Sequence, residues 1–298
     1  MRRTPSAVDA MLLGTVLLWA LNITVTKYVL QHGFRPLSYA TIRYFAATTL
    51  FWVFTYVRER SFRIERRDLW LVVLAALLIF VNQLGFVYGV DDSDAATVAL
   101  ILGTTPIFIG IIATLAHVER VQRSFWAAAI VSFAGVGFIA WGGGGFAGHA
   151  RGDLFALLTA STWAAYSVTI APLMRRYSPF RISALVLAIG WIPLAIAGAN
   201  QTAGQSFHFA TITWIGFAYA VVGPLFMTNI LWFTAISRVG PARASLFANL
   251  QPFFAVIFAL LILGERLNRY ELVGAAAIFA GIALERTRRR RPSLSAAD

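Results

Sequence analysis

One long stretch of this chain occurs twice, so the fold must be built from two related halves. Residues 95–136 align with residues 241–282 at an offset of about 146 positions without a gap, and roughly one position in three is identical. Each copy holds an apolar segment with a central proline, a charged turn, and a second apolar segment rich in alanine and glycine. Chance similarity between hydrophobic helices is the alternative, but the same proline, Glu-Arg pair and Phe-Ala-Gly triplet recur in register. The pattern therefore favours an internal duplication.

The apolar runs in both copies are long enough to cross a lipid bilayer. Hydrophobic residues make up 59% of the chain and charged residues only 13%, whereas a soluble domain of this length carries more charge. About 20 apolar residues span the hydrocarbon core as a helix, so we predict an all-α membrane protein. Ten transmembrane helices are expected, at residues 9–29, 37–57, 69–89, 94–116, 124–141, 153–173, 180–199, 212–234, 243–263 and 268–285.

The ten predicted helices divide into two repeats of five, residues 1–148 and residues 149–298. The run Gly142 to Gly145 belongs to the linker between them; a phosphate-binding loop is the alternative, but no strand precedes it and no Gly-Lys-Thr follows. Because five is odd, the second repeat must enter the membrane from the side opposite to the first. Inverted repeats of this kind surround a central cavity and place a substrate site near the bilayer midplane.

Basic residues predict which side of the membrane each loop occupies. With a cytoplasmic N-terminus, about 19 of the 25 Lys and Arg residues lie inside and about four lie outside, so both termini are expected in the cytoplasm of a bacterial cell, with the protein in its inner membrane. Met1 to Asp9 lead directly into a full span, and no cleavable signal peptide is expected. The net charge of +12 suits anionic lipid rather than nucleic acid. With no cysteine, disulfide and thiolate chemistry are excluded.

Several local patterns carry a family resemblance. They are the two proline-centred helices that end in Glu119-Arg120 and Glu265-Arg266, and the segments Leu18-Trp19-Ala20-Leu21-Asn22, with Lys27, and Ile42-Arg43-Tyr44-Phe45. With these patterns the chain resembles the drug/metabolite transporter superfamily, specifically ten-helix exporters built from two EamA domains, and among them the bacterial exporters of amino acids, including aromatic ones. The resemblance implies a basket of helices around a central cavity. One departure is Val118 where the second copy has Gly264, so the first turn is expected to be less sharp.

Two matching stripes of polar residues lie at membrane depth, where such side chains must face a cavity or a neighbouring helix. The first helix carries Thr15, Trp19, Asn22 and Thr26 on one face, and the sixth repeats the pattern as Thr159, Trp163 and Tyr166. Tryptophan normally concentrates at the membrane surfaces, so two central tryptophans predict the lining of a substrate site. Bulky packing between helices is the alternative.

Further candidates follow from amides and prolines in the spans. The same offset relates Gln83 to Asn229 and Phe86 to Trp232, and paired amides at mirrored depths can orient a ligand or join helices by hydrogen bonds. Pro106 and Pro252 predict helix kinks and freed carbonyls, which contact ligand or only bend the helix. The predicted substrate-binding residues are Trp19, Asn22, Gln83, Trp163, Tyr166, Asn229, Trp232 and Gln251.

Apart from Arg181, Arg243 and Arg269 at span ends, Lys27 and Arg43 are the only cations within the predicted spans, and both lie in the outer half. They can bind a substrate carboxylate, or they can pair with the aspartates of the outer loop, residues 91–94. The structural pairing is slightly favoured. The two Glu-Arg turns are expected to be ion pairs that order their loops rather than ligand sites.

What the spans lack excludes several classes of protein. No Asp or Glu lies in the central part of any span, so flux is expected not to need a proton gradient. The four histidines show no metal-ligand spacing, and the motifs of ATP-driven pumps and intramembrane hydrolases are absent, so neither an enzyme nor a cofactor is expected. A non-transporting receptor is a rival that the duplicated polar stripes argue against.

The sequence therefore predicts an exporter of neutral amino acids, with aromatic ones among the best substrates. Aromatic faces suit stacking and attract an ammonium group, while amides and freed carbonyls satisfy a zwitterion. Cargo with a net charge is disfavoured, because the site has no fixed central charge to balance it. Other small metabolites or lipophilic drugs are the alternative cargo. The expected partners are the amino acid and the lipid bilayer, without nucleic acid, and a monomer is compatible with this arrangement.

Overall fold

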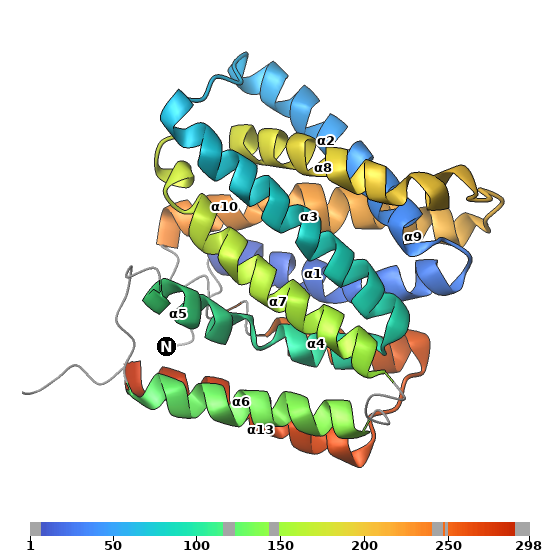
Figure 1. Cartoon of the computed structure of the whole chain (residues 1–298), viewed down its shortest axis with the longest axis vertical. Coiled ribbons are helices and arrows are strands. Elements are labelled where there is room, and N and C mark those ends of the chain that lie inside the picture. Colours follow the sequence, from blue (N-terminus) through green and yellow to red (C-terminus); the bar gives the residue numbers. More distant parts are fainter. Residues whose placement is uncertain (1–6, 116–122, 143–148, 240–246, 248–249, 290–298) are drawn as a thin grey trace, which may run out of the picture.

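Ten helices, several of them broken, make up the computed structural model, which describes residues 7–115, 123–142, 149–239, 247 and 250–289 (Figure 1). The first half contains α1 (Ala7–Gln31), α2 (Pro36–Glu59), α3 (Leu69–Asp92), α4 (Ala95–Leu102) continued by α5 (Thr105–Leu115), and α6 (Arg123–Gly142). The second half contains α7 (Ala150–Ile170), α8 (Pro179–Ala203), α9 (Thr211–Val221) continued through the π-helical η4 (Val222–Met227) into α10 (Thr228–Val239), α12 (Gln251–Phe258) continued by the π-helical η5 (Ala259–Leu263), and α13 (Arg269–Arg289).

Six helical stretches of the described residues are long and apolar enough to cross a membrane: Ala7–Gln31, Arg66–Asp92, Ala95–Ile112, Ala150–Arg175, Pro179–Ala203 and Thr211–Trp232. The prediction of an all-α fold with ten helices is confirmed. The Glu119-Arg120 turn, residues 143–148 of the linker and the arginine-rich segment from residue 290 lie outside the described residues.

The helices of the two halves pack against one another as a pseudo-twofold arrangement requires. The third helix of each half packs on the first helix of the other half. α3 packs on α7, and α9 and α10 pack on α1. Three further pairs join a helix to its own counterpart: α2 with α8, α4 with α12, and α6 with α13. Figure 1 shows α6 beside α13, and α3 beside α7. The duplication seen in the sequence is therefore also a duplication of contacts.

The second helix of each half begins in the same way. Pro36 opens α2 and Pro179 opens α8, and proline suits this position because its missing N–H would have no partner there. Ser178 also caps α8, since its hydroxyl accepts a hydrogen bond from Arg181 N at 3.1 Å. These shared starts fix a common register for α2 and α8.

The expected kinks at the prolines take the form of helix breaks. Residues 103 and 104 interrupt the helix between α4 and α5, immediately before Pro106. Pro252 lies in the first turn of α12, where it removes no helical hydrogen bond. A methyl group on Gly103 would lie 3.0 Å from Pro252 Cγ, so the break between α4 and α5 lies against the first turn of α12.

Corresponding loops join the halves at each end of the helices. At one end, the Asp68 carboxylate accepts hydrogen bonds from Arg176 and Tyr177, and Glu59 pairs with Arg181. The corresponding loops at the other end use neutral groups: the amide oxygens of Gln201 and Gln205 accept from the backbone N–H groups of residues 37 and 35, at 2.9 and 2.8 Å. The contacts at the ends of α2 and α8 thus use charged side chains at one end and amides at the other.

Candidate functional site

Three tryptophans from both halves contact one another. The Trp19 ring in the middle of α1 lies edge-on to Trp163 of α7, with centroids 6.4 Å apart, and 5.1 Å from Trp232 of α10. Tyr166 continues the cluster, 5.4 Å from Trp163. We call these four side chains the indole cluster. All four were predicted as site residues, and the structure brings them together although they lie up to 213 positions apart in the chain (232 minus 19).

The indole of Trp19 is held by a polar contact between the halves. Its Nε1 donates to Thr228 Oγ1 at 3.0 Å, and the threonine hydroxyl in turn donates to Pro224 O at 2.6 Å. The offset of about 146 relates Thr228 to Asn82, whose amide donates to Thr159 O on α7 at 2.9 Å. In each half, a polar side chain of the third helix therefore bonds the first helix of the other half.

Gln83 and Arg43 form the centre of a buried hydrogen-bonded chain. The Gln83 amide oxygen accepts from Arg43 Nη2 at 2.7 Å, and its nitrogen donates to Asn82 Oδ1 at 3.0 Å. Arg43 Nη1 donates to the Tyr39 hydroxyl at 3.2 Å, which shares a hydrogen bond of 3.0 Å with Thr26 Oγ1. The chain links α1, α2, α3 and, through Asn82, α7. Among the described contacts, Arg43 does not pair with the outer aspartates; its partners are neutral.

Lys27 lies near the C-terminal end of α1 and binds backbone carbonyls. Its Nζ donates to the carbonyls of Asp91 at 3.0 Å and Ser93 at 2.8 Å, and the side chain is buried. The expectation that this lysine contacts the 91–94 loop therefore agrees with the geometry, although through carbonyls rather than carboxylates.

The remaining predicted amides lie in different surroundings. Asn229 donates to Leu225 O of its own helix, so it does not repeat the role of Gln83. The Asn22 amide oxygen is buried and makes no hydrogen bond within the described residues. Gln251 is half-buried in the first turn of α12, and Trp163 remains 38% exposed. Asn22 therefore keeps a buried acceptor without a described partner, and Trp163 keeps exposed aromatic surface.

The second Glu-Arg turn holds a helix N-terminus. The Glu265 carboxylate accepts from Ala95 N and Ala96 N, both at 2.9 Å, at the start of α4. Burial raises the pKa of Glu265 above its usual range, although these two N–H groups lower it. Glu271 holds the same turn by accepting from Thr97 Oγ1 at 3.0 Å. Glu265 was expected to order a loop as an ion pair; it orders the start of α4 through backbone N–H groups instead.

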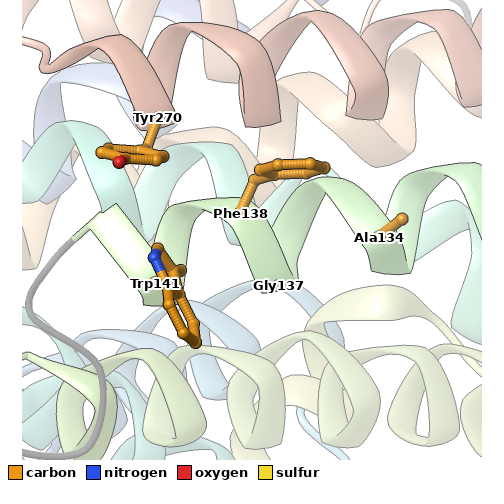
Figure 2. A pocket seen from close by; sticks show the side chains of 5 residues that line it. All are labelled: Ala134, Gly137, Phe138, Trp141 and Tyr270. Carbon is orange, nitrogen blue, oxygen red and sulfur yellow. The ribbon is translucent and has the colours of Figure 1, made fainter.

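A shallow apolar cleft of about 290 Å³ lies between α6 and α13. Figure 2 shows its lining, which is Ala134, Gly137, Phe138, Trp141 and Tyr270. None of the predicted site residues belongs to this cleft, and its walls offer a single hydroxyl and a single indole N–H. Elsewhere in the described part of the chain, no group of three or more His, Asp or Glu side chains could hold a metal ion.

The sequence did not predict two residues that bond to predicted site residues. Thr228 accepts a hydrogen bond from Trp19, and Tyr39 accepts one from Arg43. The offset that relates Thr228 to Asn82 was visible in the sequence and could have identified the first. Nothing in the pattern marks Tyr39.

Known proteins are similar to this chain over most of its length. The model of the EamA-like transporter family matches residues 7–141 and again residues 150–286. Among similar relatives, the uncharacterized transporter YcxC of Bacillus subtilis (strain 168) is 28% identical over 298 residues, covering 94% of this chain and 92% of that protein. Its relative YcbK, from the same organism, is 24% identical over 278 residues, with coverage of 90% and 89%.

Similarity extends beyond that organism and to a solved structure. An uncharacterized transporter of Archaeoglobus fulgidus is 25% identical over 279 residues, which covers 90% of this chain and 94% of that protein. A protein of known crystal structure has a TM-score of 0.66 at 16% identity and covers 97% of this chain and 100% of its own; it shares the fold.

Proposed function

Since this chain belongs to the EamA-like transporter family, and is a multi-pass membrane transporter and not an enzyme, we propose that it exports neutral amino acids, aromatic ones above all, across the bacterial inner membrane. The two repeats, residues 1–148 and 149–298, alternate access to a site between them. Small-molecule cargo follows from the family; the amino-acid cargo is our inference.

The indole cluster is the observation that carries this proposal. Trp19, Trp163 and Trp232 come from both repeats and contact one another, and Trp19 and Trp163 lie near the middle of their helices, where tryptophan is otherwise uncommon. A site shared by both repeats changes when the repeats move relative to each other. Such coupling between a binding site and the moving halves is what alternating access requires.

The chemistry of the cluster favours a flat, apolar side chain with an ammonium group. Indole faces stack with aromatic rings and attract cations through the ring quadrupole by about 0.5–2 kcal/mol. The buried amide oxygen of Asn22, one turn from Trp19, is an acceptor without a partner among the described residues and suits a substrate ammonium. Gln251 and the helix break beside Pro106 supply further polar groups near the crossing of α4 and α12.

Other small metabolites or lipophilic drugs are a second candidate cargo. The observation that favours them is that the indole cluster is apolar over most of its surface, while Gln83, one of the predicted ligand amides, is already bonded to Arg43. Cargo with several negative charges fits poorly, because Lys27 and Arg43 are the only cations of the predicted spans apart from arginines at span ends, and Lys27 binds backbone carbonyls.

Flux in proteoliposomes tests the proposal. Purified protein is reconstituted and loaded with labelled phenylalanine, tryptophan, leucine, glutamate, arginine, a sugar phosphate and a lipophilic cation, with and without a pH gradient. We expect phenylalanine and tryptophan to move fastest, at rates that do not depend on the pH gradient. Glutamate or the sugar phosphate moving faster than phenylalanine would overturn the cargo, and selective movement of the lipophilic cation would favour the second candidate.

A further inference from the structure

Arg43 is a buried cation whose partners in the described structure are all neutral. The side chain is 2% exposed, in the outer half of α2. Its Nη atoms donate to the Tyr39 hydroxyl and the Gln83 carbonyl, and the guanidinium carbon lies 5.0 Å and 5.5 Å from the ring centres of Tyr39 and Phe86. Its Nε donor has no partner within the described residues. The described arginines that do pair with carboxylates, Arg67, Arg151, Arg176 and Arg181, lie at helix ends or in loops.

A buried charge of this kind is unfavourable unless something balances it. Amide and hydroxyl oxygens and aromatic faces offset part of the desolvation, but none of them carries a full negative charge. Ionisable groups inside a membrane are rare for this reason, and where they occur they mark binding sites and transport pathways. Arg43 therefore leaves a positive site that an anionic group would complete.

The fold itself does not require the arginine. Aligning α2 and α8 on their opening prolines, Pro36 and Pro179, places Val186 where α2 has Arg43, and Val186 is also buried. α2 and α8 pack against each other as counterparts, so the same position is filled by an apolar side chain in one repeat and by a cation in the other. A role in packing would be served by valine in both.

The hydrogen-bonded chain connects Arg43 to the indole cluster. Gln83 binds Arg43 and, through Asn82, reaches Thr159 O on α7. Thr159 is one helical turn, about 6 Å along the axis, before Trp163. Gln83 and Tyr39 also fix the guanidinium from two sides, leaving the edge with Nε for a ligand.

We propose that Arg43 is the residue that recognises the carboxylate of the transported molecule. The inference rests on the proposed function in assigning that carboxylate to an amino acid, whose aromatic side chain contacts the indole cluster. In the present structure the guanidinium is buried, so the carboxylate reaches it in a conformation in which the helices around α2 have separated. Tyr39 and Gln83 are positioning residues that hold the Arg43 guanidinium in place.

Equilibrium binding to the purified protein, followed by quenching of tryptophan fluorescence, tests this with matched ligands. The probes are phenylalanine against phenylalaninamide and phenylacetate against phenylacetamide, pairs that differ in the carboxylate. We expect the wild type to bind each acid at least tenfold more tightly than its amide, and Arg43→Gln to lose this preference while binding the amides unchanged. Lys27→Gln, which removes the other intramembrane cation, should keep the preference.

Two results overturn the inference: a wild type without preference for the acids, or an Arg43→Gln protein that is folded and still prefers them or weakens acid and amide equally. Should Arg43→Gln fail to fold, Arg43→Lys keeps the positive charge but lacks the planar guanidinium. We expect Arg43→Lys to retain a reduced preference for the acids. An unchanged preference would contradict the proposed role of the guanidinium edge.

The same probes separate this inference from the proposed function. Phenylacetate binding that depends on Arg43, without phenylalanine binding or flux, would defeat the amino-acid proposal and leave the carboxylate site standing. Phenylalanine flux that persists in Arg43→Gln with unchanged affinity would defeat the carboxylate site at Arg43 and leave the amino-acid proposal standing.

Discussion

Trp19, in the middle of α1, contacts the other repeat both through its ring and through a hydrogen bond. Its ring lies edge-on to Trp163 and tilted against Trp232, and its N–H donates to Thr228 Oγ1. Removing the ring therefore removes stacking surface and a polar contact between repeats at once, whereas removing Trp163 removes surface alone, because no described hydrogen bond ends on its indole nitrogen.

We expect Trp19→Ala and Trp163→Ala to reduce phenylalanine flux at least tenfold while the protein stays folded and monodisperse in detergent. A lost ring contact is worth roughly 0.5–1.5 kcal/mol in either variant, and Trp19→Ala also loses a hydrogen bond worth about 0.5–1.5 kcal/mol, so a tenfold effect of about 1.4 kcal/mol lies within the range of both. Trp70→Ala is the control, since that tryptophan is 63% exposed at the start of α3. Full activity in both variants of the indole cluster would reduce it to helix packing.

Single positions show where prediction from sequence succeeds and where it stops. Trp19 and Trp163 could be paired because the duplication repeats them on matching stripes, and burial of polar faces then brings them together. The same symmetry argument equated Gln83 with Asn229, and there it misled: Gln83 is bonded to Arg43, whereas Asn229 bonds its own helix. The difference comes from Arg43, whose counterpart is Val186, and a partner present in one repeat alone cannot be derived from the repeat.

At the scale of elements, the start of α4 depends on a carboxylate from the other repeat. Asp94 precedes α4 but makes no side-chain capping bond, and Glu265 accepts from the first two N–H groups instead. An N-terminal helix end offers free N–H donors and a partial positive charge, so a carboxylate there stabilises the helix. The contact joins the two repeats at the end of the bundle that carries the 91–94 loop.

Glu265→Ala should destabilise the protein by about 0.5–2 kcal/mol, the usual effect of losing a helix cap. Thermal unfolding in detergent measures it, with Glu65→Ala as the control, because Glu65 forms an exposed ion pair with Arg67 that contributes little. Equal shifts in the two variants would contradict the capping role.

The size of that effect should depend on pH. Burial raises the pKa of Glu265 in the folded protein, so the folded state keeps this proton at a pH where the unfolded chain has released it. The stabilisation from this linkage is complete below the ordinary Glu pKa and is lost as the pH rises through the raised value. The difference in melting temperature between the wild type and Glu265→Ala should therefore shrink across that interval; a difference that grows would reverse the sign of the pKa shift.

Helix positions were predictable from apolar run length, but helix irregularities were not. The breaks near Pro106 follow from proline chemistry, and so does the position of Pro252 in a first turn. The π-helical segments η4 and η5 do not, because an inserted residue leaves the apolar composition of a span unchanged and is decided by packing against the neighbours, as where η4 contacts α1 and α2.

For the whole molecule, the duplication predicted more than any local pattern. Five helices in each repeat imply that the repeats are inverted. Inversion implies that a loop of the first repeat and the corresponding loop of the second repeat lie at opposite ends of the molecule. The structure agrees in its contacts: the 58–68 loop meets the α7–α8 connection at one end, and the α1–α2 connection meets the end of α8 at the other. The conformational state could not be predicted, because one sequence serves every state of a transport cycle.

The two ends of the molecule differ in charge, and from this difference we expect both termini in the cytoplasm. The end at which Asp68 and Glu59 lie also holds the basic loop 58–68 and Arg175, Arg176 and Arg181, whereas the other end holds the amides of Gln201 and Gln205. Positively charged loops stay in the cytoplasm during insertion. The chain has no cysteine, so single substitutions Arg63→Cys and His208→Cys, both at exposed positions, can be labelled without background. An impermeant maleimide on intact cells should label His208→Cys at once and Arg63→Cys only after permeabilisation; the opposite pattern would invert the protein in the membrane.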